Sequence, residues 1–130
     1  MAKILIVEDE PDIALGLGDD LTLDGHEVEI VGDGDSAVRR GREPQWEAIV
    51  LDVMLPDING KEVCHRVRSD ITLEEVRIIC ISGMCEPDKI EDLKASGANE
   101  FLQKPFEAEV LVDRICSLLD IETGVAGSGS

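Results

Sequence analysis

The chain has 130 residues, of which 43% are hydrophobic, so it is long enough and apolar enough to fold as one domain. Its 12 basic and 29 acidic residues give a formal charge of −17, which argues against direct binding to nucleic acid or to an anionic membrane surface. No apolar run approaches the roughly 20 residues that span a bilayer. The run after the first three residues is too short for a signal peptide, so we expect a cytoplasmic protein.

The first predicted element is a buried strand over residues 3–7, a β-branched apolar run that ends at Glu8. A helix is expected from Pro11, a residue that suits the first helical turn. Its apolar positions have helical spacing through Leu23, and Gly25 suits its end. Strands over 27–31, 47–51, 76–81 and 99–103 then alternate with helices over 35–41, 61–68, 88–95 and 107–119.

This alternation predicts an α/β fold with a doubly wound, five-stranded parallel sheet and five helices. In the last helix, one apolar face is expected to be formed by Val110, Leu111, Ile115, Leu118 and Leu119. Residues 1–120 are expected to form the domain. Residues 121–130 are mostly glycine, serine and alanine, and are expected to form a flexible tail or the start of a linker.

The cysteine and histidine pattern predicts no zinc site and no disulfide framework. The four cysteines contain no CxxC pair, so we expect reduced and mostly buried thiols at Cys64, Cys80, Cys85 and Cys116. His26 has no evident metal-binding partner nearby in the sequence. Trp46 precedes the third strand and is expected to pack at the far end of the sheet from any site at the carboxyl ends of the strands.

Polar residues that could bind a ligand or take part in a reaction follow four of the predicted strands. Glu8 and Asp9 follow the first, Asp52 the third, Ser82 the fourth and Lys104 the fifth. In a parallel sheet the carboxyl ends of the strands lie along one edge, and ligands bind there where the strand order reverses. With the order 2-1-3-4-5, the first and third strands would be neighbours and their carboxylates would converge.

Converging carboxylates favour a divalent cation. Two carboxylates about 5 Å apart repel each other by roughly 3 kcal/mol at an effective dielectric constant near 20. Oxygen ligands favour Mg²⁺, with Mn²⁺ as an alternative, over zinc. One carboxylate could then act as a nucleophile toward a phosphoryl group, whose oxygens Lys104 and Ser82 could hold. Singly, each residue also fits an ordinary role as a helix cap, loop acid, turn residue or surface charge; the joint pattern favours a site.

The chain resembles the receiver domains of two-component response regulators over residues 3–119. The matching segments are ILIVEDEP at 4–11, LDVMLPDINGKEV at 51–63, ISG at 81–83 and GANEFLQKPF at 97–106. Their order and spacing are highly specific for the family, although ISG alone is a weak signal. The resemblance implies the flavodoxin-like strand order 2-1-3-4-5.

The resemblance also implies a role for each acidic residue. Asp52 matches the phosphoacceptor, which takes a phosphoryl group from the phosphohistidine of a histidine kinase. Glu8 and Asp9 match the acidic pair that holds Mg²⁺ together with Asp52 and the backbone carbonyl of Met54.

The remaining matches concern the response to phosphorylation. Lys104 matches the phosphate-binding lysine, and the Lys104–Pro105 peptide bond is a candidate for the cis form. Ser82 and Phe101 match the switch hydroxyl and the switch aromatic residue; here the aromatic residue is Phe, so it has no hydroxyl. The implied output surface is the face formed by the fourth helix, the fifth strand and the fifth helix.

The function implied is that of a signalling phosphoacceptor that promotes its own phosphorylation and dephosphorylation, rather than an enzyme with external substrates. Its implied partners are a sensor histidine kinase or phosphotransfer protein and a downstream output domain or partner protein. A stand-alone receiver and a fragment of a longer regulator both fit the sequence. Members of the family often dimerise through the implied output surface, so a homodimer is one compatible assembly.

Three other functions fit the sequence less well. An interaction module that has lost phosphorylation would be expected to lack Asp52, Lys104 or the acid pair, and all are present. A phosphatase with an aspartate nucleophile would carry a DxD motif after the first strand and a cap insertion. A flavin or nucleotide binder would need a Gly- or Ser/Thr-rich phosphate loop there, whereas this loop is acidic.

Overall fold

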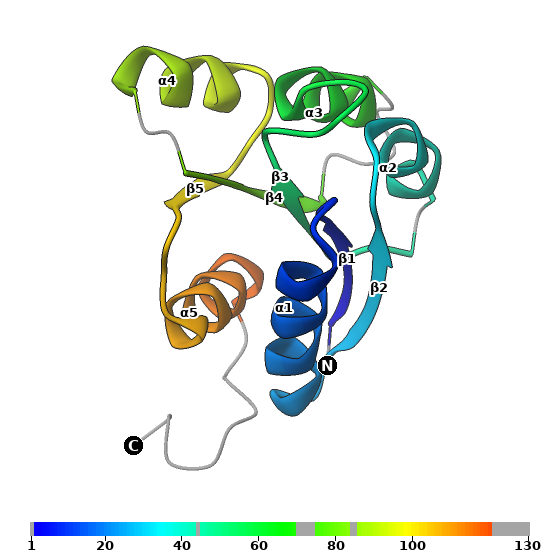
Figure 1. Cartoon of the computed structure of the whole chain (residues 1–130), viewed down its shortest axis with the longest axis vertical. Helices are drawn as coiled ribbons and strands as arrows, with labels where there is room; N and C mark the ends of the chain where they lie inside the picture. Colours follow the sequence, from blue (N-terminus) through cyan, green and yellow to red (C-terminus); the bar gives the residue numbers. More distant parts are fainter. Residues whose placement is uncertain (1, 44, 70–74, 84–85, 121–130) are drawn as a thin grey trace.

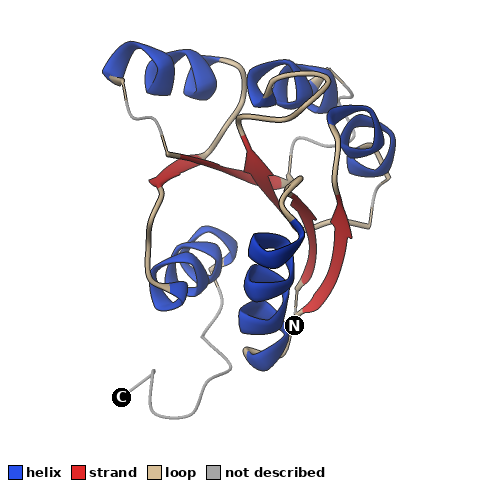
Figure 2. Cartoon of the chain, viewed as in Figure 1, coloured by secondary structure: helices blue, strands red, loops and turns tan. Residues whose placement is uncertain are grey.

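The computed structural model describes residues 2–43, 45–69, 75–83 and 86–120. Strands and helices alternate along this part of the chain (Figures 1 and 2). The strands are β1 (Lys3–Val7), β2 (Glu27–Val31), β3 (Ala48–Asp52), β4 (Arg77–Ser82) and β5 (Glu100–Gln103), and the helices are α1 (Pro11–Leu23), α2 (Gly34–Gly41), α3 (Gly60–Arg68), α4 (Pro87–Ala95) and α5 (Ala108–Leu119). The predicted elements are confirmed to within one residue at their ends. Cys85 and the predicted tail over 121–130 lie outside the described residues.

The five strands form one parallel sheet in the order β2-β1-β3-β4-β5, which confirms the order that the resemblance implied. Two strands end one residue later than expected. Asp52 pairs with Ile81, and Ser82 pairs with Gln103, so both polar residues belong to the ladder rather than to the loop beyond it. Their backbones are therefore fixed by the sheet.

Helices cover both faces of the sheet. In Figure 1, α1 and α5 lie on one side, and α2, α3 and α4 lie on the other. Side chains alternate between the two faces along each strand: Ile6 and Val50 pack in the core beneath α1 and α5, whereas Leu5 and Leu51 pack in the core beneath α2, α3 and α4. Because both faces are covered, the central strands are almost entirely buried.

Leu23, whose position fits the helical spacing, is 79% exposed, because it is the last residue of α1 and lies beyond the buried positions Leu17 and Leu21. The expectation that Val110 shares the buried face of the last helix is wrong. Val110 is 36% exposed. The buried stripe of α5 is formed by Leu111, Val112, Ile115 and Cys116, and Val110 lies at its edge.

The three described cysteines are buried free thiols, as expected. Burial raises the pKa of Cys64 and of Cys116 to about 11, and the charge of Asp24 adds to the shift at Cys116. These thiols are therefore protonated at neutral pH and poorly nucleophilic. Among the described residues, no helix combines the length and the apolar character needed to cross a bilayer.

Candidate functional site

Three carboxylates meet at the carboxyl ends of β1 and β3. The two strands are neighbours, so Glu8, directly after β1, lies beside Asp52 at the end of β3. Glu8, Asp9 and Asp52 each offer a carboxylate oxygen, and these oxygens lie within 4.8 Å of one another. Glu8 and Asp52 are buried, whereas Asp9 is exposed. The structure thus brings together the acids that the sequence pattern placed at this edge.

Lys104, the residue that follows β5, extends its side chain to these carboxylates. Its backbone N–H donates to the carbonyl of Ser82 at 2.8 Å, which anchors the residue beyond β5. Its Nζ donates to Glu8 Oε1 at 2.9 Å and to Asp52 Oδ2 at 3.2 Å. The Lys104–Pro105 peptide bond is cis, as the resemblance implied.

The cluster carries more negative charge than one lysine can balance. Burial, with the neighbouring Asp52 carboxylate, raises the pKa of Glu8 to about 7, against the opposing effect of Lys104 and the Glu10 N–H. Burial alone would lower the pKa of Lys104, but its hydrogen bonds to Glu8 and Asp52 and their charges outweigh burial and raise it. The lysine therefore stays charged, while negative charge on Glu8 is disfavoured.

This donor set fits a hard divalent cation. All the side-chain donors are carboxylate oxygens, which Mg²⁺ and Mn²⁺ prefer. Burial and the neighbouring Asp52 raise the pKa of Glu8 despite its bond to Lys104, and a cation bound among the carboxylates would favour their charged forms. The backbone of Met54 reaches the same place, because its N–H donates to Asp52 Oδ1 at 2.9 Å.

The predicted switch residues lie beside this cluster and around a cavity. Ser82 is buried at the end of β4, and Phe101 is half-buried on the neighbouring strand β5. The two line a cavity of about 290 Å³. Its other lining residues are Val53, Met54, Asn59, Lys61, Lys89, Ile90, Asp92 and Leu93. Met54 is 63% exposed at the rim.

A second group of potential metal ligands is formed by Asp24, His26 and Cys116, all buried. The expectation that His26 has no such neighbour is therefore wrong. The N–H of Ala2 donates to Nδ1 of His26 at 3.1 Å, so we assign the ring proton to Nε2, which lies 2.9 Å from Asp24 Oδ2. This tautomer leaves no lone pair on Nε2 for a metal, so we assign the group to a hydrogen-bonded network.

The network joins the turn after α1 to α5, since the Cys116 thiol also donates to Asp24 Oδ2, at 3.6 Å. Asp24 and Cys116 are 92 positions apart in the sequence, which explains why no local pattern indicates the contact. One further residue, Asp57, lies in the loop between β3 and α3. The structure places its carboxylate on the backbone of α2.

Comparison with known proteins gives a consistent result. The family model for the response regulator receiver domain matches residues 4–116. The response regulator ArlR of Staphylococcus haemolyticus is 39% identical over 120 residues, which are 92% of this chain and 53% of that protein. The chain thus spans about half the length of the curated relatives it matches.

Solved structures share the fold. The chemotaxis protein CheY4 of Vibrio cholerae superposes with a TM-score of 0.85 at 30% identity, covering 91% of this chain and 98% of that one. The receiver domain of the sensor histidine kinase PA1611 from Pseudomonas aeruginosa superposes with a TM-score of 0.84 at 28% identity, covering 92% and 98%. That structure has a magnesium ion coordinated in its active-site cleft.

Proposed function

The chain belongs to the response regulator receiver family, and on that premise we propose that Asp52 is the residue on which it accepts a phosphoryl group. Receiver domains of two-component response regulators are phosphoacceptor signalling domains. The observation that supports Asp52 is its position in the cluster: it is buried, its carboxylate lies with those of Glu8 and Asp9, and its Oδ2 is 3.2 Å from Lys104 Nζ.

In the proposed reaction, a carboxylate oxygen of Asp52 attacks the phosphorus of a phosphohistidine. The P–N bond breaks, its electron pair stays with the imidazole nitrogen, and the new O–P bond gives an acyl phosphate on Asp52. Lys104, already on the Asp52 carboxylate, can donate to a phosphoryl oxygen as negative charge develops there. Ser82 supplies the hydroxyl that we propose holds a second oxygen.

We propose that Glu8, Asp9, Asp52 and the backbone carbonyl of Met54 hold Mg²⁺, with Mn²⁺ as an alternative. When bound, the cation supplies positive charge that neutralises the transferring phosphoryl group. The crowded carboxylates and the magnesium in the PA1611 receiver domain support this assignment.

The switch that we propose begins with the phosphoryl group itself, which adds about −1.5 to −2 charge and new acceptor oxygens at Asp52. Ser82 moves toward one of these oxygens, and Phe101 turns inward on the adjacent strand. The cavity that both residues line supports this movement, because it offers space beside the ring. The face formed by α4, β5 and α5 then changes its shape for a partner or output domain.

The partners follow from this role. We propose that a sensor histidine kinase or a phosphotransfer protein supplies the phosphoryl group, and that an output domain or partner protein reads the switch. The chain then acts as a cytoplasmic signalling phosphoacceptor, not as an enzyme for external substrates.

The test is phosphorylation with acetyl phosphate and Mg²⁺, followed by measurement of the intact mass. Wild type is expected to gain one phosphoryl group and Asp52→Asn none. Asp35→Asn, which removes an exposed acid of α2, controls for the change of residue type and should be phosphorylated like wild type. A normal gain by Asp52→Asn would overturn the assignment.

The switch has its own test, the comparison of amide NMR spectra with and without beryllofluoride, which mimics the phosphoryl group. We expect shifts at Ser82, at Phe101 and along residues 86–119. Shifts confined to the loops around Asp52 and Ser82 would leave Phe101 as a fixed core ring and refute the switch.

A further inference from the structure

The loop that follows β3 is fastened to the start of α2 by the side chain of Asp57. Its Oδ1 accepts the N–H of Gly34 at 2.7 Å, and its Oδ2 accepts the N–H of Asp35 at 2.9 Å. These bonds, the Gly34 bond first, lower the pKa of Asp57 below its usual range. The carboxylate is therefore ionised at neutral pH, and its charge complements the positive end of the α2 dipole.

Two aspartates accept the backbone N–H groups in the first turn of α2. Asp57 takes the N–H groups of Gly34 and Asp35, while Asp33 Oδ1 accepts the N–H of Ser36 at 2.7 Å. Asp33 belongs to the helix's own cap and Asp57 to the loop. The loop also packs closely on the helix, because a Cβ at Gly34 would overlap the side chain of Ile58. The two elements thus interlock by hydrogen bonds and by shape.

The other end of the same loop forms part of the phosphoacceptor site. The N–H of Met54 donates to Asp52 Oδ1 at 2.9 Å. The N–H of Val53 donates to the carbonyl of Ile81 at 3.0 Å, and the N–H of Gly60 donates to the carbonyl of Val53 at 2.8 Å. Only Leu55 and Pro56 separate Met54 from Asp57, so the tie to α2 restricts the backbone that carries the Met54 carbonyl.

We propose that Asp57 is a positioning residue for the phosphoacceptor site. By holding the loop over residues 53–59 against α2, it fixes the direction of the Met54 carbonyl and thereby sets the affinity of the site for Mg²⁺. This inference rests on the proposed function, since it takes the Met54 carbonyl as a ligand. The physical reason is preorganisation: without the tie, binding must also order the loop, and that cost reduces affinity.

The alternative role for Asp57 is that of a second cap of α2, which would affect stability alone. The matched variant that separates the two roles is Asp33→Ala. It removes a carboxylate that caps the same helix end but leaves the bonds of Asp57 to the helix intact. Asp57→Ala removes the tie to the loop as well as the cap.

The experiment is calorimetric titration of Mg²⁺ into wild type, Asp57→Ala and Asp33→Ala, with amide hydrogen exchange measured on the metal-free proteins. We expect both variants to unfold at lower temperature than wild type. Asp57→Ala should raise the Kd for Mg²⁺ about 10-fold and speed exchange at Met54. Asp33→Ala should change the Kd less than twofold. Phosphorylation of Asp57→Ala should recover when Mg²⁺ is raised to saturation.

If Asp57→Ala fails to fold, Asp57→Asn provides the same comparison, because it keeps one acceptor oxygen and loses the other. We expect a smaller increase in Kd from it. Equal Mg²⁺ affinities for the Asp57 variant and Asp33→Ala would overturn the positioning role while leaving Asp52 as the phosphoacceptor. Failure of wild type itself to bind Mg²⁺ would overturn the proposed metal site and this inference together.

Discussion

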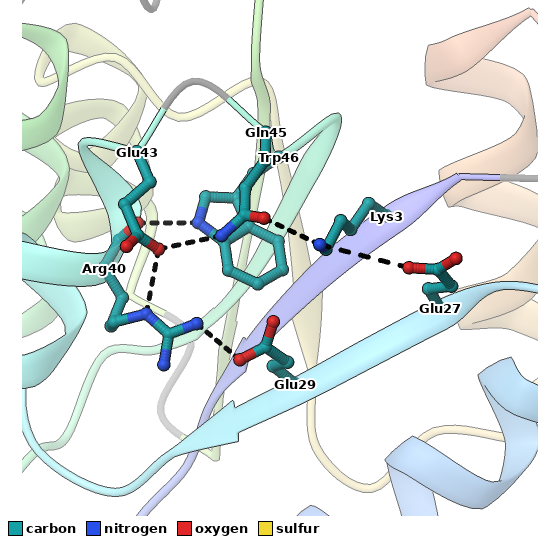
Figure 3. A network of polar contacts seen from close by, with 7 residues as sticks. All are labelled: Lys3, Glu27, Glu29, Arg40, Glu43, Gln45 and Trp46. Atoms are coloured by element: carbon teal, nitrogen blue, oxygen red, sulfur yellow. Dashed lines mark hydrogen bonds and ion pairs between the residues drawn. The ribbon is translucent and has the colours of Figure 1, made fainter.

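Both ends of the sheet carry acidic and basic side chains, but the charges are paired at the amino ends and crowded at the carboxyl ends. At the carboxyl ends, three carboxylates lie close together, and Lys104 bonds to two of them. At the amino ends, Lys3 and Arg40 lie on either side of the Trp46 ring in Figure 3, with their charged groups 5.6 and 5.7 Å from its centroid. Trp46 is buried at this end of the sheet, as the sequence predicted.

The charges at the amino ends are paired with one another. Arg40 bonds to Glu43 at 2.9 Å and also to Glu29, and Lys3 donates to Gln45 at 2.6 Å (Figure 3). The Trp46 Nε1–H donates to the carbonyl of Arg40 at 2.6 Å. One network therefore joins β1, β2, the end of α2 and the segment before β3.

The pKa values show the difference. The hydrogen bond from Arg40 holds the pKa of Glu43 below its usual range, whereas burial and Asp52 raise the pKa of Glu8 to about 7. The same chemical group is thus stabilised as a carboxylate at one end and destabilised at the other. The amino end contributes to holding the fold together, and the carboxyl end keeps unbalanced charge that a cation and a phosphoryl group can use.

The largest effect on the carboxyl end is expected from Lys104→Ala, which removes the lysine bonded to both buried carboxylates. We expect phosphorylation by acetyl phosphate to slow about 100-fold, because a donor to the phosphoryl oxygens is lost. The metal-free protein should also lose about 2 kcal/mol of unfolding free energy. Lys94→Ala, at an exposed position of α4, is the control and should change neither. An unaltered phosphorylation rate in Lys104→Ala would contradict this role.

Asp9→Asn reduces the excess charge without touching a buried residue. We expect the Kd for Mg²⁺ to rise 10-fold or more, because one proposed ligand loses its charge. The unfolding free energy without metal should stay the same or rise, since like-charge repulsion falls. Titration calorimetry and urea unfolding measure the two effects, with the exposed Asp12→Asn as control. Unchanged Mg²⁺ affinity would show that the wrong acid was assigned.

At the amino end, Trp46→Phe should have the reverse profile. The lost hydrogen bond to the Arg40 carbonyl and the weaker cation–π contacts should lower the unfolding free energy by about 1–2 kcal/mol. Mg²⁺ affinity should stay within twofold of wild type. A change in metal affinity as large as that of Asp9→Asn would show that the two ends are coupled.

Gly16→Ala is a reference substitution in α1, and it is expected to change stability through helix propensity alone. A Cβ at Gly16 would meet no atom within 4 Å, whereas one at Gly18 would lie 3.3 Å from Ile30 Cδ1. Alanine in a helix interior is favoured over glycine by about 0.5–1 kcal/mol, so Gly16→Ala should stabilise the protein by that amount in urea unfolding. Gly18→Ala should gain less. A stabilisation of the same size at both positions would contradict the close packing at Gly18.

The sheet and the carboxylate cluster could be predicted because their signals are local. Each strand is a short apolar run, and each candidate side chain, such as Asp52 or Lys104, stands at the end of one. The strand order then followed from the family resemblance. The sequence did not predict that Asp52 and Ser82 are themselves the last paired residues of their strands.

Contacts between distant segments could not be predicted in this way. The carboxylate of Asp57 bonds to backbone groups more than twenty residues away, and any exposed loop acid would look the same in the sequence. Asp24, which bonds to His26, also accepts a thiol from the last helix. Val110 was misassigned because apolar character alone does not decide which edge of a helical stripe is covered.

The phosphoacceptor can be located chemically. Borohydride reduces an aspartyl phosphate to homoserine with loss of phosphate, so protein treated with acetyl phosphate and Mg²⁺ can be reduced, digested and sequenced by mass spectrometry. We expect homoserine at position 52, and none when Mg²⁺ is omitted. Homoserine at another acid, such as Asp9 or Asp57, with position 52 unchanged, would contradict the proposed site.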